Sequence, residues 1–116
     1  MKNYSNNFEK FGIYLAKIHF DDKPNIYKIR PVVVLDEEKS IVLVLKVTSK
    51  VNQTRFLSYY LENWANYGLN VPSSVIIDFV YEVKMNDIYR DKYLGKLNEK
   101  DSTNILILLL NQVLQK

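Results

Sequence analysis

The chain has 116 residues, of which 47% are hydrophobic, 25% are charged and none is cysteine. This composition predicts one globular domain with a single hydrophobic core, and it excludes disulfides and thiolate metal sites. The net charge of +3 permits binding to an anion such as RNA or to an acidic protein, and it equally fits a charged surface that only maintains solubility.

We predict a single domain over residues 1–116 in which residues 1–10 form a polar leader or a loose first turn. This segment lacks the apolar region of a secretory signal. The most apolar run, residues 105–110, is far shorter than the roughly 20 residues needed to span a membrane. A cytoplasmic protein with no membrane contact is therefore expected.

Strands are predicted in the first half of the chain where β-branched and aromatic residues gather, at residues 12–20, 30–35 and 40–47. Pro31 is expected at the start of its strand, because it has no backbone N–H to donate to a ladder. The polar residues 21–28 predict a loop, and residues 36–39 predict the tight turn of a hairpin.

The second half of the chain predicts shorter elements. A strand is expected near residues 55–60, a short helix over 63–67, a strand or bent pair of strands over 74–83, and another short helix over 86–93. Gly68 follows the first of these helices at the position where a left-handed residue commonly ends a helix.

The last predicted element is a helix that begins after Asn98. Asn98 is a good N-cap, and Asp101, three residues later, resembles the acidic member of a capping box. Residues 105–110 are apolar all round the helix, so one small sheet cannot bury them all. Either the domain wraps this helix or the helix forms an interface with another chain, and we favour the interface.

These elements together predict a mainly β fold with short helices. Several short strands followed by one terminal helix are typical of a small barrel or a strongly curved sheet.

Four stretches resemble, in order, motifs of the MazF/PemK toxins, in particular of a PemK-like branch. They are GIYLA at 12–16, KIRPVVVL at 28–35, KVTS at 46–49, and NWANYGL at 63–69 followed by PSSV at 72–75. LGKL at 94–97, before the final helix, is similar as well, so the resemblance covers residues 11–115. It implies an SH3-like or PemK-like small barrel with a C-terminal helix.

The resemblance also implies an activity and partners. Relatives are type II toxins that work as homodimers and cut single-stranded RNA at selected sequences without a metal or other cofactor. The cut proceeds by attack of the 2′-OH and leaves a 2′,3′-cyclic phosphate. A cognate antitoxin with a disordered acidic tail blocks the RNA site.

Such a reaction needs a base for the 2′-OH, a cation for the phosphoryl oxygens and an acid for the leaving 5′-oxygen. Arg30 is the predicted catalytic cation, because a guanidinium can bind two phosphate oxygens and stays charged. Thr48 is the predicted catalytic hydroxyl that positions the phosphate. The alternatives are an exposed arginine beside a strand and a threonine that ends a strand by bonding its own backbone.

Five further residues are candidates for contact with RNA: Ser49, Lys28, His19, Asn25 and Asp78. Ser49 shares the strand end with Thr48, and Lys28 falls on the same side of an extended segment as Arg30. His19 is the only histidine and is either a general base or a structural residue. Asn25 falls where many relatives carry a glutamate in their RNA-covering loop, and Asp78 is a second acidic candidate.

This chain also departs from the family pattern, because residues 75–81 include no lysine or arginine where many relatives carry a basic residue. Two alternatives to the toxin therefore stay open. One is a binding module that holds RNA or a peptide without turnover, and the other is a dimeric interaction protein. No metal-ligand cluster and no phosphate-binding glycine loop is visible in the sequence.

Overall fold

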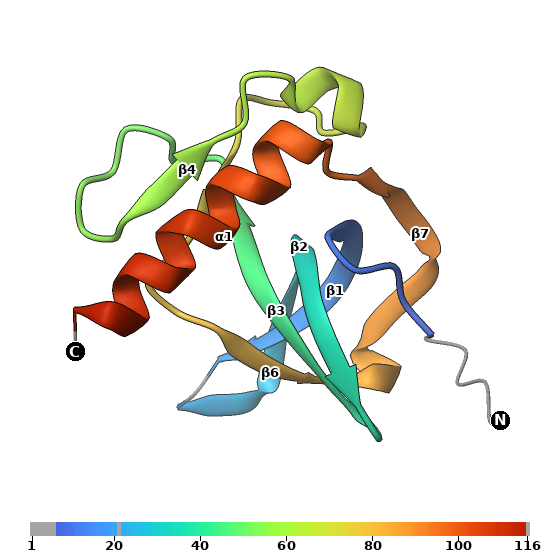
Figure 1. The fold of residues 1–116 in the computed structure, drawn as a ribbon. Helices are drawn as coiled ribbons and strands as arrows, with labels where there is room; N and C mark the ends of the chain where they lie inside the picture. Colours follow the sequence, from blue (N-terminus) through green and yellow to red (C-terminus); the bar gives the residue numbers. More distant parts are fainter. Residues whose placement is uncertain (1–6, 21, 116) are drawn as a thin grey trace, which may run out of the picture.

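The computed structural model of the chain describes residues 7–20 and 22–115 (Figure 1). As the sequence predicts, the fold is mainly β with a C-terminal helix: seven antiparallel strands form one sheet, and the helix crosses one of its faces. Six strands run in the order β4-β5-β3-β2-β1-β7, and β6 also pairs with β3. The ladders of the described residues do not close this sheet into a complete barrel.

The first three strands form a meander of β1 (Gly12–Phe20), β2 (Lys23–Glu38) and β3 (Ile41–Thr48). The predictions for β1 and β3 are confirmed, but the predicted loop at 21–28 is wrong, because β2 already begins at Lys23. The cause is the ladder to β1, which continues to His19 opposite Tyr27 and joins side chains with high strand propensity. The turn after β2 is also tighter than predicted, with Lys39 in the left-handed region at φ 58°.

Pro31 lies in the middle of β2, so its predicted place at the start of a strand is wrong. It pairs with Leu15 of β1, but the ladder between β2 and β3 begins only one residue later, at Val32 opposite Lys46. Because Pro31 has no N–H, it cannot donate a hydrogen bond that would extend this second ladder. The outer part of β2, which precedes Val32, therefore pairs with β1 alone among the described residues.

The predicted strand or bent pair at 74–83 is a bent pair, β5 (Ser74–Ile76) and β6 (Tyr81–Lys84). Both strands use the same edge of β3: β5 pairs with Val47 and Thr48, and β6 pairs with residues 41–44. The strand predicted at 55–60 is shorter than expected, since only β4 (Ser58–Tyr60) pairs with β5.

The two short predicted helices have opposite outcomes. Residues 64–67 form the 3-10 helix η1 (Trp64–Tyr67), which ends at Gly68 with φ 72° as predicted. The helix predicted at 86–93 is wrong: a 3-10 turn, η2 (Met85–Asp87), leads into the strand β7 (Ile88–Lys96). Pairing with the edge of β1, where Tyr93 lies opposite Tyr14, outweighs the local helical pattern.

Strand alternation gives the sheet two buried faces. Odd-numbered residues such as Ile13, Val33 and Leu45 form a core beneath the C-terminal helix, and even-numbered residues such as Ala16 and Val44 form a second core. Phe8 covers this second core, edge-on to the ring of Tyr14 with 5.3 Å between ring centroids. Residues 1–6 lie outside the described residues, but the buried Phe8 shows that the predicted leader does not extend to residue 10.

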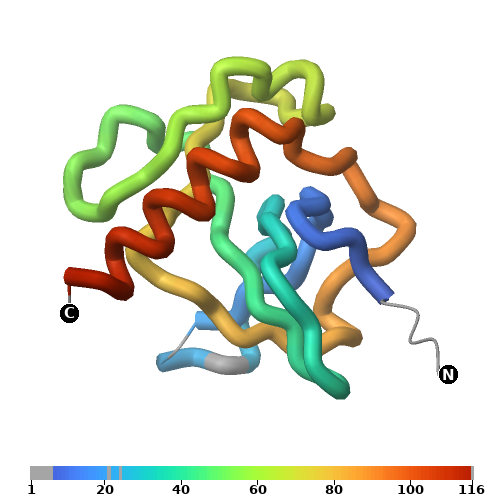
Figure 2. Tube along the Cα trace, viewed as in Figure 1, coloured from blue at the N-terminus to red at the C-terminus, as the bar shows by residue number. Residues whose placement is uncertain are grey.

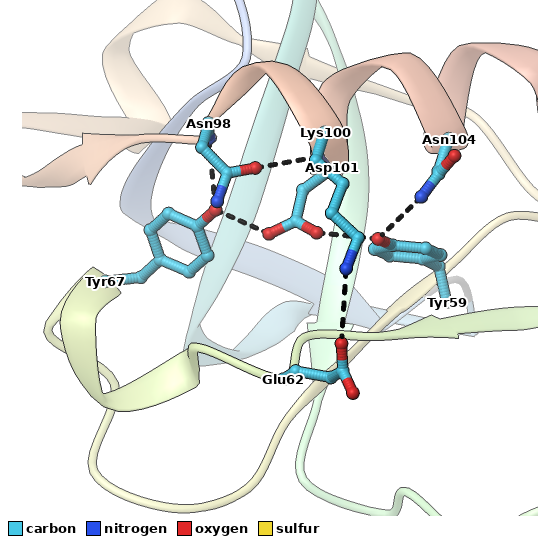
Figure 3. Close-up of polar contacts among 7 residues, drawn as sticks. All are labelled: Tyr59, Glu62, Tyr67, Asn98, Lys100, Asp101 and Asn104. Atoms are coloured by element: carbon cyan, nitrogen blue, oxygen red, sulfur yellow. Dashed lines mark hydrogen bonds and ion pairs between the residues drawn. The ribbon is translucent and has the colours of Figure 1, made fainter.

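The helix α1 (Glu99–Leu114) begins at its predicted N-cap, since the Asp101 N–H donates to the Asn98 side-chain oxygen at 2.7 Å. The capping box is closed through a tyrosine (Figure 3). The Asn98 N–H donates to the Tyr67 hydroxyl at 3.0 Å, and this hydroxyl donates to the Asp101 carboxylate at 2.5 Å. The Tyr59 hydroxyl donates to the other carboxylate oxygen at 2.6 Å. One buried carboxylate thus joins α1 to both β4 and η1.

The trace in Figure 2 shows α1 lying across the strands and beside the chain that carries β4 and η1. Ile105 is fully buried in the first core, whereas an outer face of the helix remains exposed, formed by Leu106, Ile107, Leu110, Val113 and Leu114. The prediction that the fold cannot bury the whole apolar helix is confirmed. No helix in the described part of the chain is long and apolar enough to span a bilayer.

Candidate functional site

A surface hollow lies where β2 and β3 separate, and it brings Arg30 and Thr48 together. The register of the β2–β3 ladder, continued two residues past Val32 and Lys46, would place Thr48 opposite Arg30. Both residues line a hollow of about 300 Å³ together with Pro31, Ser49 and the chain around Leu69. We call this hollow the Thr48 pocket, and its volume is sufficient for a phosphodiester group.

Arg30 also borders a second depression, which we call the basic groove. Two adjoining hollows make up this groove, and they share Ile18, His19, Lys46 and Tyr81. Five cationic side chains line the groove, from β1, β2, β3 and β6: Lys17, Lys28, Arg30, Lys46 and Lys84. Its acidic lining residues are Asp22, Glu82 and Asp87, so the groove carries an excess of positive charge.

None of the five groove cations forms an ion pair within the described residues. Within the described part of the chain, the ion pairs are His19–Asp87, Lys96–Glu9 and Lys100–Glu62. Neither Arg30 nor Lys46 takes part in any of them. Cations that have no carboxylate partner keep their full attraction for an incoming anion, and a concave surface concentrates that attraction.

The hydroxyl of Thr48 accepts a hydrogen bond from the Lys50 N–H at 3.1 Å, so it performs the local strand-ending role described above as the alternative. The two roles are compatible, because a hydroxyl that accepts one bond still has its own hydrogen to donate. Ser49 is exposed at the rim of the same pocket. Arg30 is half-buried, and its backbone is held within β2.

His19 lies in the groove at the end of β1, where its Nε2 is 3.2 Å from the Asp87 Oδ2 of η2. Its ring also lies near that of Tyr27, with 5.7 Å between centroids. Lys28 lines the same hollow as His19 and Arg30. The structure therefore places these three predicted residues along one continuous surface.

The remaining two predicted site residues lie elsewhere. Asn25 is exposed near the tip of the β1–β2 hairpin and does not line the groove or the Thr48 pocket. Asp78 is on the α1 side, where its carboxylate accepts from the Leu57 N–H at 2.8 Å and from the Gln112 side chain at 3.0 Å. Its contacts fix a loop to the end of the helix.

Sequence reasoning missed Lys46, Tyr81 and Asp87 as groove residues. Only Lys46 gave a usable signal, because it stands two residues before Thr48 in a predicted strand and so falls on the same side. Asp87 was hidden inside a segment predicted to be helical. Among the residues that the structure describes, no group of three or more histidine, cysteine, aspartate or glutamate side chains could hold a metal ion.

Residues 9–113 match the model of a protein family described as PemK-like, MazF-like toxin of type II toxin-antitoxin system. Among solved structures, the chain resembles the Mycobacterium tuberculosis toxin MazF-mt6, with a TM-score of 0.66 and 24% identity over 88% of this chain and 95% of that chain. It also resembles an endoribonuclease in complex with its cognate antitoxin from Mycobacterial species, with a TM-score of 0.64 and 11% identity over 90% and 92% of the two chains. A search of curated protein sequences found no match.

The two structural likenesses show a shared fold. The family match spans nearly the whole chain and includes the strands that carry Arg30, Lys46 and Thr48. The chain therefore belongs to the PemK-like, MazF-like toxins of type II toxin–antitoxin systems.

Proposed function

We propose that this toxin is an endoribonuclease that cuts single-stranded RNA held in the basic groove. The observation that carries the proposal is the meeting of Arg30 and Thr48 in one pocket that adjoins a groove with an excess of cations. The groove is open and basic, as a surface that follows a phosphate backbone must be. The family membership supports the same assignment.

In the proposed reaction the 2′-oxygen attacks the adjacent phosphorus, the bond to the 5′-oxygen breaks, and a 2′,3′-cyclic phosphate remains. The proton of the 2′-OH passes to a base, and the 5′-oxygen takes up a proton as it leaves. Arg30 binds non-bridging phosphate oxygens and stabilises the charge that grows on them, while the Thr48 hydroxyl donates a hydrogen bond that orients the group. Neither role requires a metal ion.

The other groove residues would hold the flanking RNA. Lys28 and His19 lie on the same surface as Arg30 and are placed to contact neighbouring phosphates or bases. Ser49, at the rim of the Thr48 pocket, supplies a further hydroxyl. Asn25 would contact RNA only where the strand passes the hairpin tip, and Asp78 has no place in this proposal, because its carboxylate faces Leu57 and Gln112.

A cognate antitoxin and a second copy of the chain are the proposed protein partners. An acidic, disordered antitoxin tail would lie in the basic groove, because its carboxylates would meet the same cations as the phosphates do.

The exposed apolar face of α1 is the proposed homodimer contact, and Leu110, with 59% of its surface exposed, lies within it. Leu110→Glu would then halve the molar mass measured by light scattering, whereas an unchanged mass would place the dimer contact elsewhere. The proposed compartment is the cytoplasm, where mRNA is present.

The test is cleavage of a long single-stranded RNA in the presence of EDTA by the wild-type chain and by Arg30→Ala. The matched control is Arg55→Ala, which removes an equal charge from an exposed arginine outside the groove. We expect cuts at a few preferred sites with cyclic-phosphate ends, a rate about 100- to 1,000-fold lower in Arg30→Ala, and little change in the control. If folded wild-type protein binds the RNA but does not cut it, the chain is a binding module and the proposal is wrong.

A further inference from the structure

Lys46 is the groove cation that β3 places next to Arg30. It lies on β3 opposite Val32, and Arg30 is two residues from Val32 along β2. Residues two apart on a strand share a face, so Lys46 and Arg30 are diagonal neighbours on the same side of the sheet. Both line the same hollow, and Arg30 also lines the Thr48 pocket.

An aromatic ring holds the Lys46 ammonium in the groove. The Lys46 Nζ lies 3.9 Å from the centroid of the Tyr81 ring, within cation–π range. Tyr81 is the first residue of β6 and pairs with Val44 of β3, so the sheet fixes the ring beside the lysine. A free lysine side chain samples many rotamers, and contact with a ring that is held in place restricts it.

The charge of Lys46 is available to a ligand. A ring attracts an ammonium without neutralising it, unlike a carboxylate, and in the described residues Lys46 forms no ion pair. An ammonium held on one side by a ring keeps its other N–H groups free to bind an anion. The arrangement therefore resembles a prepared site for a phosphate oxygen.

We infer that Lys46 is a second catalytic cation, which binds the same RNA phosphate as Arg30, and that Tyr81 is a positioning residue for it; this inference rests on the proposed ribonuclease function. Phosphoryl transfer builds negative charge on the non-bridging oxygens, and two cations on one phosphate stabilise that charge better than one. Lys46 neither gives nor takes a proton in the step. It supplies, from β3, the positive charge that residues 75–81 lack.

The first test compares Lys46→Gln and Lys46→Arg with wild type in single-turnover cleavage at saturating enzyme. Lys92→Gln is the matched control, because Lys92 is exposed on β7 and lines neither the groove nor the Thr48 pocket. We expect Lys46→Gln to lower the maximal rate by about 100-fold, Lys46→Arg to recover part of the loss, and the control to match wild type. Affinity is measured separately on an RNA whose reacting nucleotide carries a 2′-O-methyl group and cannot be cut.

The second test separates the aromatic face of Tyr81 from its hydroxyl. Tyr81→Phe keeps the ring and should cleave within about twofold of wild type, whereas Tyr81→Leu should lower the maximal rate by about tenfold. Urea unfolding of both variants shows whether β6 is intact, and the Lys46 variants test the inference even if Tyr81→Leu does not fold.

The outcomes distinguish the two proposals. If wild type cuts RNA and Arg30→Ala does not, but Lys46→Gln retains the wild-type maximal rate, the ribonuclease stands and this inference is wrong. A Lys46→Gln variant that only binds the uncleavable RNA more weakly also overturns it, because Lys46 would then contact a phosphate away from the reaction. Absence of cleavage by folded wild type overturns the proposed function and this inference with it.

Discussion

The carboxylate of Asp101 should be the most sensitive single polar group for the stability of this fold. Its residue is only 5% exposed, and its two oxygens accept hydrogen bonds from the hydroxyls of Tyr59 and Tyr67. Each hydroxyl also accepts one hydrogen bond. The Tyr59 hydroxyl accepts from the Asn104 side chain, and the Tyr67 hydroxyl accepts from the Asn98 N–H. In Asp101→Asn, the new side-chain amide nitrogen would face one of these two hydroxyls. An amide N–H group cannot accept a hydrogen bond, so the hydrogen of that tyrosine hydroxyl would be left without an acceptor.

The cost follows from these contacts. One hydrogen bond to a charged acceptor, worth about 1.5–3 kcal/mol, is lost, and the second becomes a weaker neutral bond. Removing a buried charge returns part of this energy, so we expect a net loss of about 2–4 kcal/mol in the free energy of unfolding. The matched control is Glu99→Gln, which removes an exposed charge from the same helical turn and should cost only about 0.3–1 kcal/mol.

Urea unfolding of wild type and both variants, followed by circular dichroism, measures these differences. If Asp101→Asn loses no more stability than Glu99→Gln, then Asp101 acts only through its charge near the helix end, and the tyrosine contacts contribute nothing. A loss several times that of the control would show that the hydrogen bonds across three elements account for the effect.

Two other expectations concern stability. Burial, reinforced by the neighbouring Asp101 and opposed by the Asn98 N–H, raises the pKa of Tyr67 from 10.0 to about 12, so the stabilisation is complete below pH 10 and disappears as the pH rises from 10 to 12. Over that interval wild type should lose about 2 kcal/mol more unfolding free energy than Tyr67→Phe, and parallel pH curves would contradict this. A Cβ on Gly12 would lie 2.9 Å from the Glu9 carbonyl oxygen, so Gly12→Ala should destabilise the fold by about 1–3 kcal/mol, although reduced chain entropy alone would favour alanine. A urea midpoint of Gly12→Ala at or above that of wild type would show that the backbone near Glu9 moves to accommodate the Cβ without loss of stability.

Elements specified by local sequence were predictable. The Asn98 cap, the stop at Gly68 and the apolar strand β3 depend on residues close together in the chain. The β7 strand was not predictable in this way, because the edge of β1, about 75 residues earlier, decides its conformation. The position of Pro31 was misjudged for a related reason, since only the register shows that one edge of β2 lacks a partner there.

The candidate site likewise contains residues that the sequence predicts and contacts that it does not predict. Arg30 and Thr48 stand out through motifs, and the strand register then brings them to one pocket. The contacts of Lys46 with Tyr81 and of His19 with Asp87 join residues 35 and 68 positions apart in the chain, and no local pattern reports them. Asp78 illustrates the converse, because an acidic residue in a predicted strand has a structural role, in which its carboxylate joins the loop at Leu57 to the end of α1.

The separation of β2 from β3 at Pro31 should also divide one continuous strand into two parts of different stability. Residues 32–38 are held by ladders on the β3 side, whereas the outer part of β2 among the described residues is paired with β1 alone. Amide hydrogens in that outer hairpin should therefore exchange with deuterium through openings that cost less than global unfolding. Lys28 and Arg30 belong to this more labile unit, while Lys46 and Thr48 belong to the rigid one. The proposed binding surface would thus span two cooperative units, and we expect ligands of different shape to change its width without disrupting either core.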